Sequence, residues 1–433
     1  MSGLRVLVSA FACCPPARPG FSGGEDLLGW NLLKQIARSH EVWALTHSTW
    51  QSSIQEALED ESIENIHFQY IGLPKIFLPL LRVQGGHQFY YYLWQIKAYF
   101  KAKKLHRSHN FQLFHHLTYA NDWMVSFIGA LLPVPYVRGP GGGAHRTPKS
   151  LAAEYTAKAR VWEKVRSLGQ WFFRHDPFYV RGQSRAGALL LCNWDAMTSV
   201  PQEWSQKIHL FPVSGVSSED FALEAAPRSE DAGFHVLSAG SLIRVKGFSL
   251  AVKAFKEFVE KRPESRLTIV GRGPEEDRLR SLIHESNLDD KVQLAGEMPR
   301  GTLLSEMAAC DVVLFPSLRD GGGTVVIEAM SVGKPVVCLD TGGPGMHIDD
   351  GCGIKITPSS PGNTVSELAA ALDRLYLDEG LRHKLGKEAR RRAEENYHWD
   401  RLGDRLMEIY RSVVPGEAEV QMDSALISDG GTT

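Results

Sequence analysis

The sequence of 433 residues lacks the features that define several large classes of protein. It contains no apolar run approaching the roughly 20 residues that a membrane-spanning helix needs, so no such helix is predicted. Lys and Arg total 48 against 50 Asp and Glu, so there is no overall positive charge to attract nucleic acid. The N-terminus has no basic start followed by a long apolar core. We therefore expect residues 4–10 to form a first β-strand and not a signal peptide.

Cysteine is scarce and scattered along the chain. No C-x-x-C pair occurs, which argues against the common zinc motifs. Some cysteines lie in apolar runs such as LLLCN and PVVCLD, where Cys behaves as a small hydrophobic residue. We expect reduced thiols in a cytosolic protein. The six cysteines are Cys13, Cys14, Cys192, Cys310, Cys338 and Cys352.

The first strand is not followed by a G-x-G-x-x-G turn with an acidic residue about twenty positions later. That pattern is the fingerprint of dinucleotide-dependent oxidoreductases, so this class is disfavoured. The length is too great for one ordinary hydrophobic core, and we expect two domains.

The first half of the sequence has the order strand, Gly-rich loop, helix, strand. LRVLVSA and EVWALTH are apolar strands, and LLGWNLLKQIARS between them has apolar residues at helical spacing. This β-α-β unit predicts a parallel sheet. Further strands are expected at FQLFHHL, PYVRGP and GALLLCN. Two basic insertions interrupt the pattern, an aromatic one near residues 74–107 and a predominantly helical one at 145–186.

A second β-α series begins near residue 233, after a linker rich in Pro, Ser, Gly and acids. Its strands are nearly continuous apolar runs, which is typical of a sheet covered by helices on both faces. We place an N-terminal domain at residues 1–212 and a C-terminal domain at 213–395. A helix at 396–413 and a disordered tail at 414–433 follow.

The segment RDGGGTVVIEAM, residues 319–330, places three glycines between a strand and a helix. Glycines at such a turn allow a ligand to approach the backbone, and the helix N-terminus favours a phosphate. Asp320 precedes the glycines at the strand end. Glu328 lies within the helix, where a carboxylate can accept hydrogen bonds from two vicinal hydroxyls, as in a ribose.

This segment resembles the signature of the retaining glycosyltransferases of family GT4. Their pattern is close to P-S-x-x-E-G-F-G-L-x-x-x-E-A-M-A-x-G-x-P-V-V, and this chain has PSLRDGGGTVVIEAMSVGKPVV at 316–337. AGSLIRVKGFSLAVKAF, LTIVGRGPEEDRL, VQLAGEMP and ACDVVLFPS also follow the family's order. The resemblance covers the second half of the chain and is looser in the first. It implies an α/β protein of the GT-B fold, with two Rossmann-like domains facing a central cleft and a C-terminal helix that returns towards the N-terminal domain.

The resemblance also implies roles for individual residues of the signature. Glu328 would bind the ribose of a nucleotide-sugar donor. Asp320 stands where the family has glutamate, and would contact hydroxyls of the transferred sugar. Backbone N–H groups of Gly322, Gly323 and Thr324 would bind the sugar and the phosphate.

A second phosphate element is expected in GSLIRVKG, residues 240–247. The family usually has G-R-L-x-x-x-K-G here. Lys246 matches the lysine that would stabilise the leaving diphosphate, whereas Ser241 replaces the arginine. Arg244 is close enough in the sequence to compensate. The nucleotide base would be recognised by backbone near Gly271 and Met298.

In the first half, the family places a loop over the diphosphate or the acceptor, and Gly23 and Gly24 fall in this loop. Glu25 begins the helix that follows and would face the acceptor. A histidine at the end of the strand FHHL would face the transferred sugar. Both His115 and His116 are candidates, with His116 favoured slightly. The glycine loop RGPGGGAHR adds two acceptor-side candidates, Arg138 and Gly142.

We therefore expect a retaining hexosyltransferase that uses a nucleotide sugar, with UDP- and GDP-sugars first among the donors. The chain has no D-x-D motif, which other glycosyltransferases use to bind a metal, so no metal or other cofactor is expected. The acceptor is a glycan, a lipid or a small molecule. A non-catalytic nucleotide-sugar-binding protein and a nucleotide-sugar epimerase of the same fold remain alternatives. Residues 74–107 interleave aromatic and basic residues, which fits either a packed helix or a membrane-surface patch on the cytoplasmic face.

Overall fold

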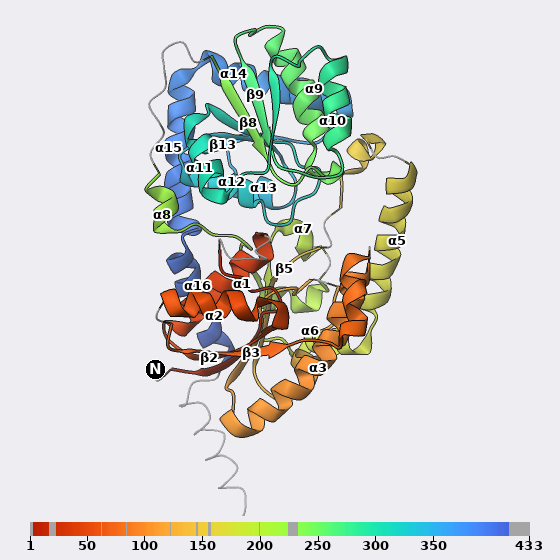
Figure 1. The fold of residues 1–433 in the computed structure, drawn as a ribbon, viewed down its shortest axis with the longest axis vertical. Helices are drawn as coiled ribbons and strands as arrows, with labels where there is room; N and C mark the ends of the chain where they lie inside the picture. Colours follow the sequence, from red (N-terminus) through yellow and green to blue (C-terminus); the bar gives the residue numbers. More distant parts are fainter. Residues whose placement is uncertain are drawn as a thin grey trace, which may run out of the picture.

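The computed structural model shows two α/β domains, one above the other in Figure 1. It describes residues 3–16, 23–61, 63–83, 85–121, 123–143, 146–154, 157–198, 200–223 and 233–414. The predicted disordered tail, from residue 415 on, lies outside these ranges, as do parts of the predicted linker and of the loop before Gly23.

Within the described residues, the N-terminal domain has a seven-stranded parallel sheet in the order β3-β2-β1-β4-β5-β6-β7. The central strands are buried along nearly their whole length, because helices cover both faces of the sheet. The strands are β1 Arg5–Ser9, β2 Glu41–His47, β3 Ile66–Ile71, β4 Leu113–His116, β5 Tyr136–Gly141, β6 Ala188–Leu191 and β7 Ile208–Leu210.

The helices of this domain include both predicted insertions. The first insertion forms η2 and α3, and the second forms η3, α5 and α6. The helices are α1 Gly24–Ala37, η1 Ser48–Trp50, α2 Gln51–Asp60, η2 Lys75–Arg82, α3 Gly86–His109, α4 Phe127–Leu131, η3 Lys149–Glu154, α5 Ala157–Arg174, α6 Pro177–Arg185, α7 Trp194–Met197 and η4 Gln202–Lys207.

In the described part of the C-terminal domain, six parallel strands have the order β10-β9-β8-β11-β12-β13. The strands are β8 His235–Ala239, β9 Arg266–Val270, β10 Val292–Gly296, β11 Val312–Phe315, β12 Val336–Leu339 and β13 Gly353–Ile356. The helices are α8 Ser218–Phe221, η5 Arg244–Lys246, α9 Phe248–Val259, α10 Glu276–Glu285, α11 Arg300–Ala309, α12 Thr324–Ser331, α13 Gly342–His347, α14 Pro361–Leu377 and α15 Glu379–Asn396.

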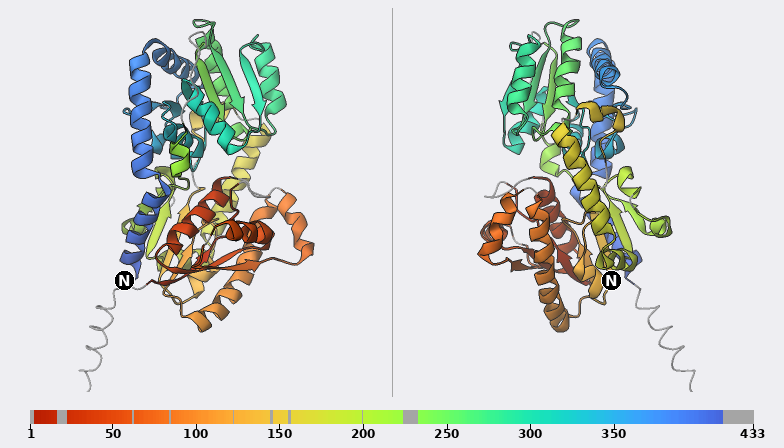
Figure 2. Two further views of the ribbon diagram at one scale, coloured as in Figure 1. Left: turned by 60° about the vertical axis from the view of Figure 1, so that its left-hand side comes forward. Right: turned by 90° about the vertical axis from the view of Figure 1, so that its right-hand side faces the viewer.

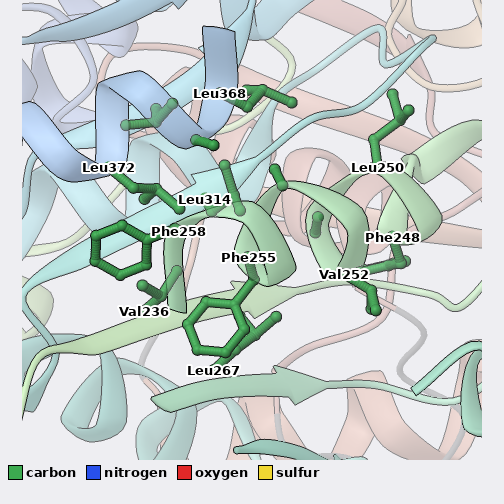
Figure 3. Packing of buried hydrophobic residues seen from close by; sticks show 14 of the residues in the cluster. Val236, Phe248, Leu250, Val252, Phe255, Phe258, Leu267, Leu314, Leu368 and Leu372 are labelled. Atoms are coloured by element: carbon green, nitrogen blue, oxygen red, sulfur yellow. The ribbon is translucent and has the colours of Figure 1, made fainter. Parts of the chain in front are cut away.

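The core of the C-terminal domain lies where α9 and α14 cover one face of its sheet (Figure 3). Phe255 and Phe258 of α9 are fully buried, as are Leu314 of β11 and Leu368 of α14. The apolar residues of α9 recur at helical spacing, so they form one continuous face. Each such side chain contributes about 1.5–3 kcal/mol on burial, which holds α9 and α14 against the sheet.

The last helix, α16 Trp399–Val413, leaves the C-terminal domain and packs against the N-terminal domain. Leu406 and Tyr410 belong to the N-terminal core, and Gly403 lies close against Gln35 of α1. Figure 1 shows α15 along one domain and α16 along the other. This confirms the predicted fold of two Rossmann-like domains with a returning C-terminal helix.

All six cysteines lie within the described ranges, are buried and form no disulfide. None of the helices in these ranges is long and apolar enough to cross a membrane.

Candidate functional site

The strongest cluster of polar groups lies at the carboxyl end of β11. Asp320 follows this strand, and its Oδ1 accepts hydrogen bonds from the backbone N–H groups of Gly322 and Gly323, each at 3.0 Å. Its Oδ2 forms an ion pair with Nζ of Lys246, which comes from the loop after β8. The structure therefore brings together two residues that are 74 positions apart and that the sequence predicts for one site.

The charge of Asp320 is fixed by these contacts. Burial raises the pKa of the carboxyl group, but Lys246 and the two N–H groups outweigh burial, so the pKa lies below its usual value. Asp320 is thus a carboxylate at neutral pH, with an ammonium group beside it.

The glycine turn has a backbone that only glycine adopts easily. Gly323 has φ of 58° and directly precedes α12, and a Cβ there would lie 2.9 Å from Cδ2 of His347. Gly342 has φ of 52°, and a Cβ there would lie 2.1 Å from the carbonyl oxygen of Asp320. Two glycine loops, one after β11 and one after β12, therefore pack against each other at the N-terminus of α12.

His347, which the sequence reasoning missed, holds this turn in place. Its Nε2 lies 2.8 Å from the carbonyl oxygen of Gly322, and its Nδ1 lies 2.9 Å from the hydroxyl of Tyr397. Burial lowers the pKa of His347 to about 4, so the ring is neutral at pH 7. Nε2 must then carry the proton, because a carbonyl oxygen only accepts. A histidine after a second glycine loop is the signal that was available in the sequence.

Glu328, on α12, is buried, with 5% of its surface exposed. Its Oε1 accepts a hydrogen bond of 2.8 Å from Nε of Arg300 at the start of α11. Burial raises the pKa of Glu328, and Arg300 opposes that effect. Arg300 also binds both carboxylate oxygens of Asp220 in α8, at 2.5 and 3.0 Å. Arg300 was not predicted as a site residue, and it links the predicted ribose residue to the segment between the domains.

The loop after β8 directs its two basic side chains, Lys246 and Arg244, to different partners. Lys246 reaches Asp320, whereas Nη2 of Arg244 lies 3.0 Å from Oε1 of Glu275 at the start of α10. Ser241 is exposed on the same loop. Arg244 is therefore directed to α10 in this structure and does not join Lys246 beside Asp320.

The predicted base-recognition residues lie at the same edge of the sheet. Gly271 follows β9 with φ of 139°, and its N–H donates to the carbonyl oxygen of Gly296 at 2.7 Å. A Cβ at Gly271 would lie 1.9 Å from the carbonyl oxygen of Gly240, so the loops after β8, β9 and β10 are in close contact. Met298 is half-buried and packs on the apolar cluster that includes Ile327 of α12.

The N-terminal domain contacts these loops directly. Nδ2 of Asn193 donates to the carbonyl oxygen of Gly321 at 3.0 Å, and Oδ2 of Asp195 accepts from the N–H of Gly342 at 3.3 Å. Glu163 of α5 forms an ion pair of 2.6 Å with Arg319, the neighbour of Asp320. Sequence reasoning did not single out Asn193, Asp195 or Glu163, because such partners depend on how the domains pack.

The ring of His115 is held by contacts within the protein, so a role at the sugar stays a prediction for its backbone. This residue is fully buried, its Nε2 lies 2.5 Å from the carbonyl oxygen of Gly139, and its Nδ1 lies 2.6 Å from the hydroxyl of Tyr410. Burial lowers its pKa to about 4. Both ring nitrogens are engaged within the protein, so His115 anchors α16 and has no nitrogen left for a sugar.

His116 is also fully buried, and its Nε2 lies 2.6 Å from the hydroxyl of Tyr91 on α3. Burial, with Arg138 and His115 nearby, lowers its pKa well below the usual value. It is therefore a neutral ring that packs between the sheet and α3. A role at the sugar stays a prediction for His116, one that would require its backbone or a rearranged ring.

Glu25 lies at the start of α1, after Gly23 with φ of 87° and Gly24 with φ of 25°. Among the described residues, no atom lies within 4 Å of a Cβ built at either glycine. Solvent reaches the Glu25 side chain, yet protein surrounds it enough that burial raises its pKa to about 7. Its Oε2 accepts a hydrogen bond of 3.1 Å from the N–H of Tyr119, whose φ is 55°.

The other acceptor-side predictions fall inside the domain. Arg138 has 3% of its surface exposed and donates to the carbonyl oxygens of Asn121 and Met124. It therefore supports the loop after β4, and a role on the acceptor side stays a prediction for Arg138. Gly142 is half-buried, and a Cβ there would lie 2.4 Å from Sγ of Cys192.

Across the described part of the chain, no group of three or more His, Cys, Asp or Glu side chains is arranged to hold a metal ion. The charged groups at the end of β11 are the pair of Lys246 and Asp320 and the pair of Arg319 and Glu163, beside a helix N-terminus. Such a site can bind a phosphate and several hydroxyls at once.

Comparison with known proteins supports the resemblance to glycosyltransferases. Residues 222–392 match the family model described as "Glycosyl transferases group 1", which confirms the resemblance for that segment. The chain is 35% identical over 188 residues to a D-inositol 3-phosphate glycosyltransferase of Paenarthrobacter aurescens, covering 42% of this chain and 45% of that one. It is 30% identical over 179 residues to an alpha-D-kanosaminyltransferase of Streptomyces kanamyceticus, covering 41% and 45%. The alignments thus span less than half the length of these relatives.

Solved structures match nearly the whole chain. Anabaena HepE, solved in complex with UDP, has a TM-score of 0.62 at 16% identity and covers 94% of this chain and 100% of its own. WaaG, a glycosyltransferase involved in lipopolysaccharide biosynthesis, has a TM-score of 0.60 at 17% identity and covers 95% and 100%. At this identity the likeness shows the fold, which is GT-B.

Proposed function

We propose that this protein is a glycosyltransferase that moves a hexose from a nucleoside-diphosphate sugar to an acceptor hydroxyl with retention of the anomeric configuration. The observation that carries the proposal is the group formed by Asp320, Lys246 and the glycine turn at the N-terminus of α12. The family match of residues 222–392, which includes this group, supports it.

The positive groups of the site suit the leaving group of such a reaction. When the bond between the sugar and the phosphate breaks, negative charge grows on the diphosphate. Lys246 and the backbone N–H groups at the start of α12 are positioned by the fold before the reaction, so they can stabilise this charge without reorganising. We infer that they do so without a metal ion.

The two acids have different roles in this proposal. Asp320, ionised at neutral pH, accepts hydrogen bonds from hydroxyls of the transferred sugar. Glu328 accepts hydrogen bonds from the ribose once Arg300 shifts towards Asp220 or shares the carboxylate. Gly322, Gly323 and Thr324 contribute backbone contacts.

Retention follows if the acceptor attacks the same face of the sugar that the diphosphate leaves. The acceptor oxygen forms the new bond to the anomeric carbon, the bond to the phosphate oxygen breaks, and the departing phosphate takes the acceptor proton. This route needs no side chain as general base. It is consistent with a site in which both candidate histidines are buried and neutral.

UDP-sugars are the first donors to test, because UDP is bound in the structurally similar HepE. GDP-sugars are second. The acceptor is a glycan, a lipid or a small molecule, and the names of the relatives include enzymes acting on inositol phosphate and enzymes transferring kanosamine. Assembly of a glycoconjugate or polysaccharide is the setting that we propose.

The test is a turnover assay with UDP- and GDP-hexoses and a panel of hydroxyl acceptors, with release of nucleoside diphosphate as the readout. The wild type should release the diphosphate, and proton NMR of the product should show the anomer of the donor. The turnover of the Lys246→Ala variant should be lower by about 100-fold or more, the range for loss of one such charge stabiliser. An inverted anomer would refute retention. Tight nucleotide binding without turnover on any acceptor would favour the non-catalytic alternative.

A further inference from the structure

Helix α5 presents its apolar side chains to solvent. Val161, Val165, Leu168 and Phe172 recur at spacings of four, three and four residues and therefore form one stripe. Their exposed fractions are 60%, 52%, 67% and 67%. Two tryptophans flank this stripe, Trp162 with 42% and Trp171 with 59% of its surface exposed. A helix that packs on a soluble domain normally has the opposite arrangement.

Three polar residues of α5, Glu163, Arg166 and Gln170, face the protein instead. Glu163 pairs with Arg319 of the C-terminal domain, and Arg166 donates to the carbonyl oxygen of Gly143. Gln170, which is buried, donates to the same oxygen at 2.8 Å. These contacts fix the rotation of the helix about its axis, so the outward direction of the apolar stripe follows from the polar contacts on the other side.

The neighbouring helix α3 extends the exposed apolar surface of α5. Phe173 of α5 lies 6.3 Å from Tyr92 of α3, measured between ring centroids. α3 itself exposes Phe89, with 54% of its surface accessible, and Phe100, with 64%. Figure 1 shows α5 along the outer side of the molecule, and Figure 2 shows the same side turned towards the viewer. We call the exposed apolar residues of α3 and α5 the α3–α5 face.

The charge around this face is positive. Residues 65–121, which contain α3, include no Asp or Glu. Lys101 and Lys104 of α3 and Lys164 of α5 are exposed. Residues 1–212 as a whole contain 22 Lys and Arg against 14 Asp and Glu, a formal net charge of +8. Pairing two copies through this face would bring like charges together, whereas a negatively charged surface would neutralise them.

We propose that the α3–α5 face binds the surface of an anionic lipid bilayer. The tryptophans and the apolar stripe of α5 enter the headgroup region with the helix parallel to the membrane, and the lysines contact lipid phosphates. The inner side of the same helix touches the loops that carry Arg319 and Gly143. The docked enzyme therefore holds its predicted acceptor side close to the lipid surface. This inference does not depend on the identity of the donor.

The test is co-sedimentation of the full chain with vesicles of phosphatidylcholine alone or with about one third phosphatidylglycerol. The wild type should bind the anionic vesicles, and binding should weaken as NaCl rises from about 0.05 to about 0.5 M. The double variant Leu168→Ser/Phe172→Ser should lower the partition coefficient by about tenfold or more. Lys101→Gln/Lys104→Gln should lower it by about fivefold per lysine on the anionic vesicles only. Leu377→Ser is the matched control, because Leu377 is equally exposed, at 64%, on α14 of the other domain.

Two results would overturn the proposal. One is the absence of wild-type binding to anionic vesicles at low salt. The other is a concentration-dependent dimer, measured by light scattering, that the Leu168→Ser/Phe172→Ser variant abolishes, since the face would then be covered by a second copy. Nucleotide-induced thermal shifts of the same variants should equal that of the wild type. Loss of that shift in the wild type would count against the proposed function and leave the lipid test unaffected.

Discussion

Asp320 and Glu328 are two carboxylates of one signature in different surroundings. Asp320 has an ammonium group and two N–H groups around it, and its pKa is lowered. Glu328 has one arginine and a deep apolar setting, and its pKa is raised. The shorter side chain of Asp320 still reaches Lys246 and the glycine turn. The aspartate, which stands where the resembled signature has glutamate, therefore makes charged contacts of its own at this position.

Asp320→Asn tests the role of this charge. The amide oxygen can still accept from Gly322 and Gly323, so the turn should keep its shape, but the partner of Lys246 is lost. We expect turnover to fall by about 100-fold while affinity for the nucleoside diphosphate changes only a few-fold. Steady-state kinetics and calorimetric titration measure the two effects. Normal turnover in this variant would remove Asp320 from the reaction.

Glu25 predicts a pH dependence of stability. Its pKa of about 7 in the folded protein exceeds the usual value of about 4.3, so the folded state holds the proton more tightly than the unfolded state. The resulting stabilisation is complete below the unfolded pKa and is lost as the pH rises through about 7. Glu25→Gln does not titrate. The melting temperature of this variant minus that of the wild type should therefore increase as the pH is raised from about 5 to about 8. A difference that is constant with pH would contradict the shifted pKa.

At the scale of elements, α16 packs the C-terminal part of the chain against the N-terminal domain. The neutral ring of His115 donates from Nε2 to Gly139 and accepts at Nδ1 from the Tyr410 hydroxyl. Tyr410→Phe leaves Nδ1 buried without a partner. We expect a loss of about 1–3 kcal/mol in the free energy of unfolding, measured by denaturant titration. Donor affinity should not change, since the site is in the other domain. An unchanged free energy of unfolding would show that water or another group replaces the hydroxyl.

The sequence predicted the elements that have strong local signals. β1, β2 and the strands and helices from β8 to β12 follow from apolar runs, helical spacing and glycine turns. β3, β7 and β13 were not recognised. β3 and β13 have partly polar patterns, and β7 is only three residues long, so their strand character comes from pairing with a neighbour.

The site was predictable to the extent that its residues lie in one motif. Asp320 and Glu328 were singled out because they flank one glycine turn, and Lys246 because its segment resembles a second motif of the family. Arg300 and Glu163 were not, because their partners are distant in the chain and are set by packing. The contacts of the His115 ring could not be predicted for the same reason, because the ring contacts Tyr410, which is 295 positions away in the chain.

For the molecule as a whole, charge is divided between the domains. The N-terminal domain is positive, and residues 213–433 contain 26 Lys and Arg against 36 Asp and Glu, a formal net charge of −10. In the proposed function, the anionic nucleotide sugar is bound by Lys246 and a helix N-terminus within an acidic domain. In the proposed membrane interaction, the positive domain meets anionic lipid. The overall charge of −2 conceals this division.

The two domains are also connected by specific contacts on either side of the glycine turn. Asn193, Asp195 and Glu163 reach the loops of the donor side, and Arg300 reaches Asp220 in the connecting segment. In the proposed function, donor binding at Glu328 is thereby coupled to the segment between the domains. We expect this coupling to accompany domain closure around both substrates.

The most direct measurement is a thermal-shift titration with UDP, GDP, ADP and dTDP, with and without EDTA, on the wild type and two variants. Glu328→Gln removes the proposed ribose carboxylate, and Glu367→Gln, an exposed site on α14, is the matched control. One diphosphate should raise the melting temperature of the wild type and of Glu367→Gln regardless of EDTA, because it binds only the folded state. In Glu328→Gln most of that rise should be lost. No shift with any diphosphate in the wild type, or an undiminished shift in Glu328→Gln, would contradict a donor site built on α12.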